Sequence, residues 1–290
     1  VEILVQLSES TAERRPLWEY TLSFRHAGGG IFKNQAIIME EKVVDLLLNK
    51  TLIHRRDTKN EDKETLKFTF LEQPNANSGF RDIYYFFQET QYLHIVPQLI
   101  RDANSYLLAA NKEDFFGRNL LERMNKTNKK TRESYLNRIN EFLKIAVPQL
   151  QNITLVPDDK GVPHLEATYI HWRAKGAKQQ EKQFSDGTLR LIGFMWALLD
   201  GQEAILLEEP ELYLHTAIVK QLPEFIYKMQ RRKGKVRQVF VSTHSYELLS
   251  NEGIGGDETI VLIPSPEGTK VQKASDMEGI RRYLDSGISI

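Results

Sequence analysis

The stretch Ala204-Ile205-Leu206-Leu207-Glu208-Glu209-Pro210-Glu211 is an apolar run that ends in two adjacent carboxylates. A short run of Ile and Leu is typical of a strand buried on both faces of a parallel sheet. Because ligands bind at the carboxyl ends of such strands, we expect Glu208 and Glu209 to face a ligand crevice. The alternative is a pair of solvent-facing acids after a core strand, but Pro210 restrains the backbone directly after them. The stretch therefore predicts an α/β fold with an acidic site.

Two further stretches flank this strand in the sequence. Upstream lies Phe184-Ser185-Asp186-Gly187-Thr188-Leu189-Arg190, in which Ser185 suits the N-cap of a helix. A helix N-terminus attracts anions, and Gly187 would let a phosphate approach closely. Downstream lies Gln238-Val239-Phe240-Val241-Ser242-Thr243-His244-Ser245, a second predicted strand that ends in hydroxyls and an imidazole. The alternatives are a capped surface helix and a structural histidine.

These stretches carry a resemblance to a known family. Ser185-Asp186-Gly187-Thr188 resembles a divergent ABC signature, Ile205 to Glu209 resembles a Walker B strand, and Thr243-His244-Ser245 is similar to a switch-histidine loop. The chain thus resembles ABC-type ATPases of the SMC/RecF/OLD branch. It is also similar to the AAA-family ATPases of bacterial anti-phage defence operons, including PARIS-type ATPases. The resemblance implies an ABC-type P-loop NTPase fold, with an antiparallel β lobe, a short helical insertion and a mainly parallel core sheet.

The resemblance also implies the ligands and the role of each residue. ATP and Mg²⁺ are the expected cofactors, with Glu208 at the metal, Glu209 polarising the attacking water and His244 reaching the γ-phosphate. The residues expected along the nucleotide are Ser185, Asp186, Gly187, Thr188, Thr243 and Ser245. Asp186 departs from the family pattern, which has glycine there. Its carboxylate would repel a triphosphate unless it is turned away or paired.

One element of the family is missing from these residues. ABC-type hydrolysis needs a Gly-x-x-x-x-Gly-Lys-Ser/Thr loop to cradle the phosphates, and the 290 residues contain none. The glycine cluster at 28–33 and the pair Gly234-Lys235 are better interpreted as turns. Since the chain has no initiator Met and opens on a strand at Val1, we expect the phosphate loop in an N-terminal portion absent from it.

Composition excludes several classes of protein. With 41% hydrophobic and 27% charged residues, the chain is neither disordered nor membrane-spanning. Basic and acidic residues number 39 each, so the net charge gives no evidence for a nucleic-acid partner, and any such contact must be local. The absence of Cys and of a signal-like opening favours the cytoplasm.

Three regions follow from the pattern along the chain. Residues 1–79 read as a β-rich region, with strands at 1–7, 18–24, 35–39, 52–54 and 66–71. The resemblance makes this region part of the nucleotide-binding lobe, and the alternative is an unrelated β module. Residues 80–150 read as a helical arm, with helices at 80–88, 92–101, 119–124 and 131–145. Residues 151–290 hold the three motifs. A predicted strand pair at 153–156 and 165–171 precedes them, and a helix with an apolar face begins at Ser185, in the first motif.

The expected function is an ATP-hydrolysing subunit that forms a homodimer or higher homo-oligomer around nucleotide. By resemblance it controls an effector, such as a Toprim-like nuclease, in bacterial phage defence, with a phage component or nucleic acid as trigger. One alternative is a nucleotide-dependent scaffold with little turnover that sequesters a toxic partner. Another is a RecF-like DNA-repair ATPase, which requires a basic groove.

Overall fold

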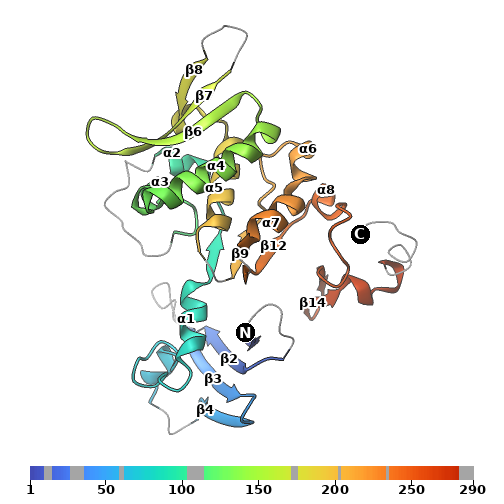
Figure 1. Ribbon diagram of the computed structural model, residues 1–290. Coiled ribbons are helices and arrows are strands. Elements are labelled where there is room, and N and C mark those ends of the chain that lie inside the picture. Colours follow the sequence, from blue (N-terminus) through green and yellow to red (C-terminus); the bar gives the residue numbers. More distant parts are fainter. Residues whose placement is uncertain are drawn as a thin grey trace. The chain divides into compact units, whose positions relative to one another are not determined.

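The computed structural model describes residues 1–9, 15–26, 36–58, 62–102, 114–170, 176–201, 204–232 and 235–280. The chain divides into two units, Val1–Thr90 and Gln91–Ile290 (Figure 1). The glycine cluster at 28–33 and Gly234 lie outside the described residues, so their interpretation as turns stays a prediction. The division into three regions at residues 79 and 150 also stays a prediction. It was based on the expected function of each region, whereas the two units are defined by which residues contact one another.

Unit 1 contains, among its described residues, an antiparallel sheet in the order β1-β2-β3-β4. Its elements are β1 (Glu2–Leu7), β2 (Trp18–His26), β3 (Ala36–Asp45), β4 (Lys50–Arg56), the 3₁₀ turn η1 (Thr65–Lys67) and α1 (Arg81–Glu89). Alternation along the strands turns one face of the sheet inward. The small core comprises Tyr20, Val43, Leu71, Phe80 and Ile83. The predicted antiparallel lobe is confirmed by these strands.

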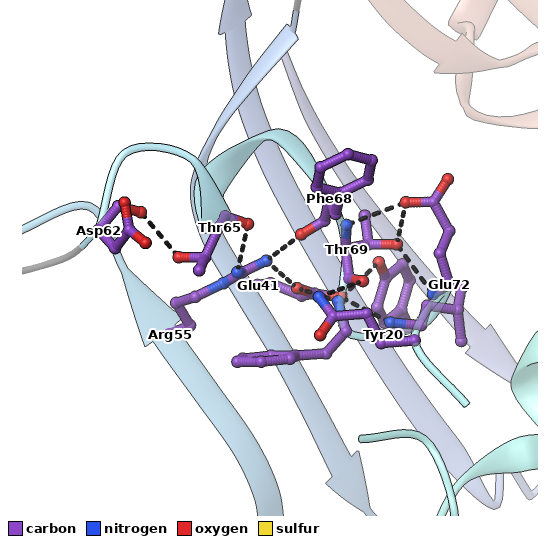
Figure 2. Close-up of polar contacts among 11 residues, drawn as sticks. Tyr20, Glu41, Arg55, Asp62, Thr65, Phe68, Thr69 and Glu72 are labelled. Atoms are coloured by element: carbon purple, nitrogen blue, oxygen red, sulfur yellow. Dashed lines mark hydrogen bonds and ion pairs between the residues drawn. The ribbon is translucent and has the colours of Figure 1, made fainter. Parts of the chain in front are cut away.

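A buried ion pair joins two strands of this sheet. The Oε2 atom of Glu41 on β3 lies 2.6 Å from the Nη2 atom of Arg55 on β4, and the two side chains are 0% and 4% exposed (Figure 2). The hydroxyl of Tyr20 donates to the other carboxylate oxygen of Glu41 over 3.2 Å. Burial, together with the neighbouring Glu41 carboxylate, raises the pKa of Tyr20 above its usual range. The pair is thus part of a desolvated network and not a surface contact.

The same network explains why the predicted strand at 66–71 is wrong. This segment forms η1 and turns instead. Arg55 donates to the carbonyl oxygens of Thr65 and Phe68 over 3.0 and 2.8 Å, and Glu41 accepts from the amides of residues 70 and 71 over 2.9 and 3.2 Å (Figure 2). Side chains therefore satisfy backbone groups that a strand would pair with a neighbouring strand.

Unit 2 is organised around a parallel sheet of β5 (Gln91–Leu93), β9 (Ile205–Glu208) and β12 (Val239–Ser242). In the described part of the chain their order is β12-β9-β5, with Gln91 and Val239 both paired to Ile205. Parallel pairing brings the carboxyl ends of all three strands to one edge. The predicted α/β fold with a parallel core sheet is confirmed.

The helix α5 (Asp186–Leu199) is the centre of the hydrophobic core of this unit. Every residue from Thr188 to Leu199 is buried, including Trp196 at 0% exposure. The predicted helix is confirmed, but the expectation of a single apolar face is wrong. Neighbouring elements cover α5 all round, as expected of a helix that is apolar all round.

Most of the other helices of unit 2 contribute to this core, whereas the hairpin of residues 260–273 lies apart from it (Figure 1). The helices of this unit are α2 (Pro97–Arg101), α3 (Leu120–Lys126), α4 (Lys129–Ala146), α6 (Thr216–Val219), α7 (Leu222–Gln230) and α8 (Tyr246–Leu249), with 3₁₀ turns η3 (Glu181–Gln183) and η4 (Ala274–Asp276). Its other strands are β6 (Leu150–Pro157), β7 (Pro163–Tyr169), β8 (Ala177–Gln180), β10 (Arg231–Arg232), β11 (Lys235–Val236), β13 (Ile260–Ser265) and β14 (Gly268–Lys273). No helix within the described ranges has the length and apolar character that a membrane span requires.

Two details of the core sheet differ from the sequence predictions. The predicted helix at 92–101 is instead β5 followed by the short α2, which has Pro97 at its first position. The strand β9 is also not buried on both faces, since Ile205 is 0% exposed and Leu206 38%. Leu206 pairs in register with Tyr92 on β5 and with Phe240 on β12, and these two residues are 41% and 49% exposed.

Candidate functional site

The two carboxylates and the histidine predicted from the sequence meet at the carboxyl edge of the core sheet. Glu208 is the last residue of β9 and pairs with Ser242, the last residue of β12. The amide of Glu209 then donates to the carbonyl oxygen of Ser242 over 2.9 Å. The Nε2 atom of His244 lies 3.8 Å from Oε1 of Glu209, with side-chain exposures of 94% and 29%. The strand pairing thus delivers the acid and the imidazole to one open edge.

The hydroxyls predicted beside His244 stabilise its loop. Thr243 donates through Oγ1 to the Glu211 carboxylate and accepts from the amide of Ser245 over 2.9 Å. Ser245 caps α8 by accepting from the amide of Leu248 over 3.3 Å. The second oxygen of Glu211 is buried and has no hydrogen-bond partner among the described residues. Glu211, which the sequence reasoning did not assign to the site, therefore fixes the position of the loop that carries His244.

Glu208 has two partners on β5 that the sequence analysis missed. The Tyr92 hydroxyl donates to Oε2 of Glu208, and Nδ1 of His94 lies 3.8 Å from the same oxygen. The rings of Tyr92 and His94 contact those of Phe115 and Phe116, with centroids 5.6 and 6.4 Å apart. Because 92–101 was interpreted as a helix, these side chains were not expected at the strand edge. The Glu208 carboxylate remains 41% exposed despite these contacts.

The N-terminus of α5 has the cap that the sequence predicted. The Ser185 hydroxyl accepts from the amide of Thr188 over 3.2 Å, and the two hydroxyl oxygens lie 2.8 Å apart. Ser185 is exposed, whereas Thr188 is only 5% exposed. Of these two residues, the structure therefore leaves Ser185 accessible to a ligand.

The charge of Asp186 is compensated within the chain. Its Oδ1 atom lies 2.5 Å from the guanidinium of Arg101, and its Oδ2 accepts from the Gln98 amide over 2.8 Å. Arg101 also donates to the carbonyl oxygen of Phe184 over 2.6 Å. The helix α2 thus neutralises a carboxylate that the sequence analysis expected to repel phosphate, and it also holds the segment that leads into α5.

Gly187 is required by a contact inside the chain. A Cβ atom at this position would lie 2.5 Å from the carbonyl oxygen of Tyr213. Tyr213 and Glu209 have φ angles of 65° and 40°, the left-handed region that residues other than glycine rarely adopt. The segment 209–213 therefore packs tightly on the first turn of α5. The sequence interpretation of Gly187, which was close approach of a phosphate, overlooked this constraint.

Arg190 links the same two segments from within the core. It is 2% exposed and donates to the carbonyl oxygens of Ile95 and Glu209 over 2.7 and 3.0 Å. Burial lowers the pKa of the Arg190 guanidinium from its usual value. The sequence showed Arg190 only as one basic residue in an apolar helix, with no signal of its partners.

The donor set at this edge fits a metal ion that also binds a phosphate ligand. Mg²⁺ is bound through one or two carboxylates, waters and phosphate oxygens, and not through a cage of protein ligands. In the part of the chain that the structure describes, no three His, Cys, Asp or Glu side chains gather into a metal-binding cluster. Glu208, half-exposed at the sheet edge, suits a Mg²⁺ site completed by waters and phosphate oxygens, and not a cage of protein ligands.

Comparison with solved structures finds SMC ATPase heads among the similar folds. A structure reported for ATP-driven dimerisation and DNA-stimulated activation of SMC ATPases has 16% identity and a TM-score of 0.39, over 53% of this chain and 92% of its own. The SMC head bound to the C-winged helix domain of ScpA has 14% identity and a TM-score of 0.44, over 94% of this chain and 78% of its own. The SMC head domain from Thermotoga maritima has 11% identity and a TM-score of 0.36, over 91% of this chain and 77% of its own.

Each of these TM-scores is below 0.5, so the family assignment depends on sequence profiles. No curated protein matches the chain. A family profile does match, over residues 32–250, which include β3 to β12 and all of the site residues described above. Because this match spans well over half of the sequence, the chain belongs to the family described as "AAA domain, putative AbiEii toxin, Type IV TA system".

Proposed function

We propose that the chain carries the hydrolytic half of an ABC-type ATPase site. The observation that supports this most directly is the placement of Glu209 and His244 at adjacent strand ends, 3.8 Å apart at an open edge of a parallel sheet. Ligands of open α/β sheets bind outside the carboxyl ends of the strands. An acid and an imidazole at such an edge suit the activation of water beside a phosphate.

Each residue then has a distinct role. Glu209 orients a water and accepts its proton, and His244 donates a hydrogen bond to the terminal phosphate. Glu208 holds Mg²⁺, and Tyr92 and His94 fix the direction of its carboxylate. When bound, Mg²⁺ supplies positive charge that neutralises the phosphate oxygens. Thr243 and Ser245 act through the loop that carries His244.

The N-terminus of α5 contributes to the site of a second subunit in this proposal. Ser185 is exposed at the start of a helix whose partial positive charge favours an anion. Arg101 neutralises Asp186, which removes the repulsion that a free carboxylate would exert on a triphosphate. Two copies would therefore enclose nucleotide between Ser185 of one subunit and Glu209 of the other, with ATP holding the dimer together.

Two further parts of the proposal extend beyond these residues. A Gly-x-x-x-x-Gly-Lys-Ser/Thr phosphate loop does not occur in these 290 residues, so the proposed site needs a phosphate cradle that they do not supply. We also propose that the ATPase controls an effector, such as a nuclease, in bacterial phage defence. The family description names a putative AbiEii toxin of a type IV toxin–antitoxin system, and this part of the proposal depends on the resemblance of the sequence motifs.

The test is Mg-ATP hydrolysis by the purified gene product and its Glu209→Gln variant. Losing the base should lower kcat by about 10²- to 10⁴-fold and leave Glu208 for the metal, so that nucleotide stays bound. The control is Glu224→Gln, another Glu-to-Gln change, on α7 at a carboxylate that is 57% exposed and paired only with Lys228 among the described residues. It should hydrolyse ATP at the wild-type rate. Undetectable wild-type hydrolysis would favour the scaffold function, and unchanged kcat in Glu209→Gln would remove Glu209 from the mechanism.

A further inference from the structure

We propose that Arg190 couples the two nucleotide sites of the dimer by linking the N-terminal turns of α5 to Glu209. The inference rests on the proposed function and adds a regulatory device to it. Arg190 is a positioning residue in this proposal, since its partners are backbone carbonyl groups of the protein and not the substrate.

The environment of Arg190 is unusual for a charged residue. Its side chain lies within the hydrophobic core at 2% exposure, and the described residues include no ion pair between it and a carboxylate. Two carbonyl oxygens, those of Ile95 and Glu209, accept from its terminal nitrogens over 2.7 and 3.0 Å. Its Nε atom is buried without a hydrogen-bond partner in the described structure. Burying a charge in this way is unfavourable, so the two hydrogen bonds must hold it in place.

A second contact reinforces the link between α5 and the segment 209–213. The backbone of Gly187 approaches the Tyr213 carbonyl so closely that a Cβ atom would lie 2.5 Å from its oxygen. The Arg190 guanidinium also lies 5.8 Å from the centroid of the Tyr213 ring. Both ends of the segment, Glu209 and Tyr213, have positive φ angles. Strained residues of this kind persist only where surrounding contacts hold them.

The packing of α5 makes it suitable for transmitting a displacement. Because every residue from Thr188 to Leu199 is buried, the helix cannot bend into solvent and should shift as one body. Ser185 caps its N-terminus, and Arg190 follows just over one helical turn later. A ligand that draws Ser185 towards it will therefore also move the guanidinium that is bonded to Glu209.

The two ends of this linkage serve different nucleotides. In the proposed dimer, Ser185 faces the nucleotide of the other subunit, whereas Glu209 acts on the nucleotide of its own. Occupancy of one site would thus set the position of the base in the other, which is coupling between sites. The expected consequence is positive cooperativity in hydrolysis, with a Hill coefficient approaching about 2 for two sites.

The test compares the wild-type gene product with Arg190→Lys. A lysine ammonium can reach one of the two carbonyl oxygens but does not have the planar fork that spans both. We expect the Hill coefficient to fall to about 1 and kcat to fall at least about tenfold, with KM within about threefold of wild type. ATP-dependent dimerisation, measured by size-exclusion chromatography, should persist because Ser185 is unchanged.

The matched control is Arg237→Lys. Arg237 is 5% exposed and donates to carbonyl oxygens of Ala197 and Asp200 at the opposite end of α5. Like Arg190 it is a buried arginine whose guanidinium bonds two carbonyl oxygens, but its partners are at the C-terminal end of α5 and do not include Glu209. The Hill coefficient of this variant should therefore stay at the wild-type value. If Arg190→Lys does not fold, Arg190→Gln removes the buried charge, keeps one amide donor and should lose cooperativity in the same way.

A measurement other than activity separates this inference from the proposed function. In a Glu209→Gln background, hydrogen exchange should show that Mg-ATP protects both the first turn of α5 and the segment 210–214. Adding Arg190→Lys should abolish protection of 210–214 and leave that of α5. Protection of both segments in the double variant, or an unchanged Hill coefficient in Arg190→Lys, overturns the coupling and leaves the ATPase assignment standing. A wild-type protein that neither binds nor hydrolyses Mg-ATP overturns both.

Discussion

Glu41→Gln should destabilise the antiparallel sheet of unit 1 strongly. The substitution removes the only carboxylate that is ion-paired with Arg55 in the described structure, and the Arg55 side chain is 4% exposed. Breaking a buried pair from one side costs about 3–5 kcal/mol, because the remaining charge is left uncompensated. The amide of glutamine has one acceptor oxygen in place of two, so it also cannot satisfy all the donors that now point at Glu41 (Figure 2). This cost is a large part of the roughly 5–15 kcal/mol that stabilises a typical domain.

Native-state hydrogen exchange of the amides in β2, β3 and β4 measures this loss directly. A cost of 3–5 kcal/mol corresponds to exchange faster by about 10²- to 10⁴-fold at the most protected amides. Glu40→Gln is the matched control, since Glu40 is the preceding residue on β3 and also pairs with an arginine of β4, Arg56, but at the surface. Its exchange should stay close to wild type. An acceleration below about tenfold in Glu41→Gln, or equal effects in the two variants, would refute the reasoning.

Three further outcomes are expected. Ser185→Arg should abolish ATP-dependent self-association in size-exclusion chromatography and lower the melting temperature only slightly, because losing this exposed N-cap costs about 0.5–2 kcal/mol; normal dimerisation would mean that Ser185 is only a cap. In calorimetry, a protein limited to residues 1–290 should bind Mg-ATP with a Kd weaker than about 1 μM, which corresponds to a binding free energy of about 8 kcal/mol. Tighter binding would reveal a phosphate cradle within these residues. Hydrogen bonds from the Val162 and Lys160 amides hold the pKa of Asp158 below its usual range. The Asp158 carboxylate therefore stabilises the fold fully above its unfolded-state pKa of about 3.9, and this stabilisation is lost as the pH falls through its folded-state pKa. The melting-temperature gap between wild type and Asp158→Asn should therefore shrink at acid pH, and a constant gap from neutral to acid pH would contradict this account.

Local patterns in the sequence predicted the elements that carry the site. The apolar runs that became β9 and β12 are bounded by polar residues, and Ser185 is a strong N-cap signal, so their prediction required no knowledge of distant contacts. In the structure Glu208 pairs with Ser242 and Glu209 lies 3.8 Å from His244, at the strand ends where the sequence placed these residues. The catalytic, metal and nucleotide roles of these residues stay predictions, since they depend on resemblance and not on geometry.

Other parts of the site could not be predicted, because they depend on pairing between distant residues. The strand β5 is three residues long, and its pairing with β9 crosses more than a hundred residues of sequence. Without that pairing, the apolar spacing at 92–101 favours a helix, and Tyr92 and His94 are not expected beside Glu208. The segment 66–71 was mistaken for a strand for a related reason, because the side chains of Glu41 and Arg55 bond its backbone.

The sequence by itself thus determined that β9, β12 and α5 exist and which polar residues stand at their ends. Only the tertiary structure decided how these residues are held. It pairs Asp186 with Arg101, explains Gly187 by the Tyr213 carbonyl, and joins Arg190 to Glu209. The physical reason is that secondary structure depends on neighbours within a few residues, whereas charge compensation, close backbone approach and hydrogen bonding in a core depend on which distant segments the fold brings together.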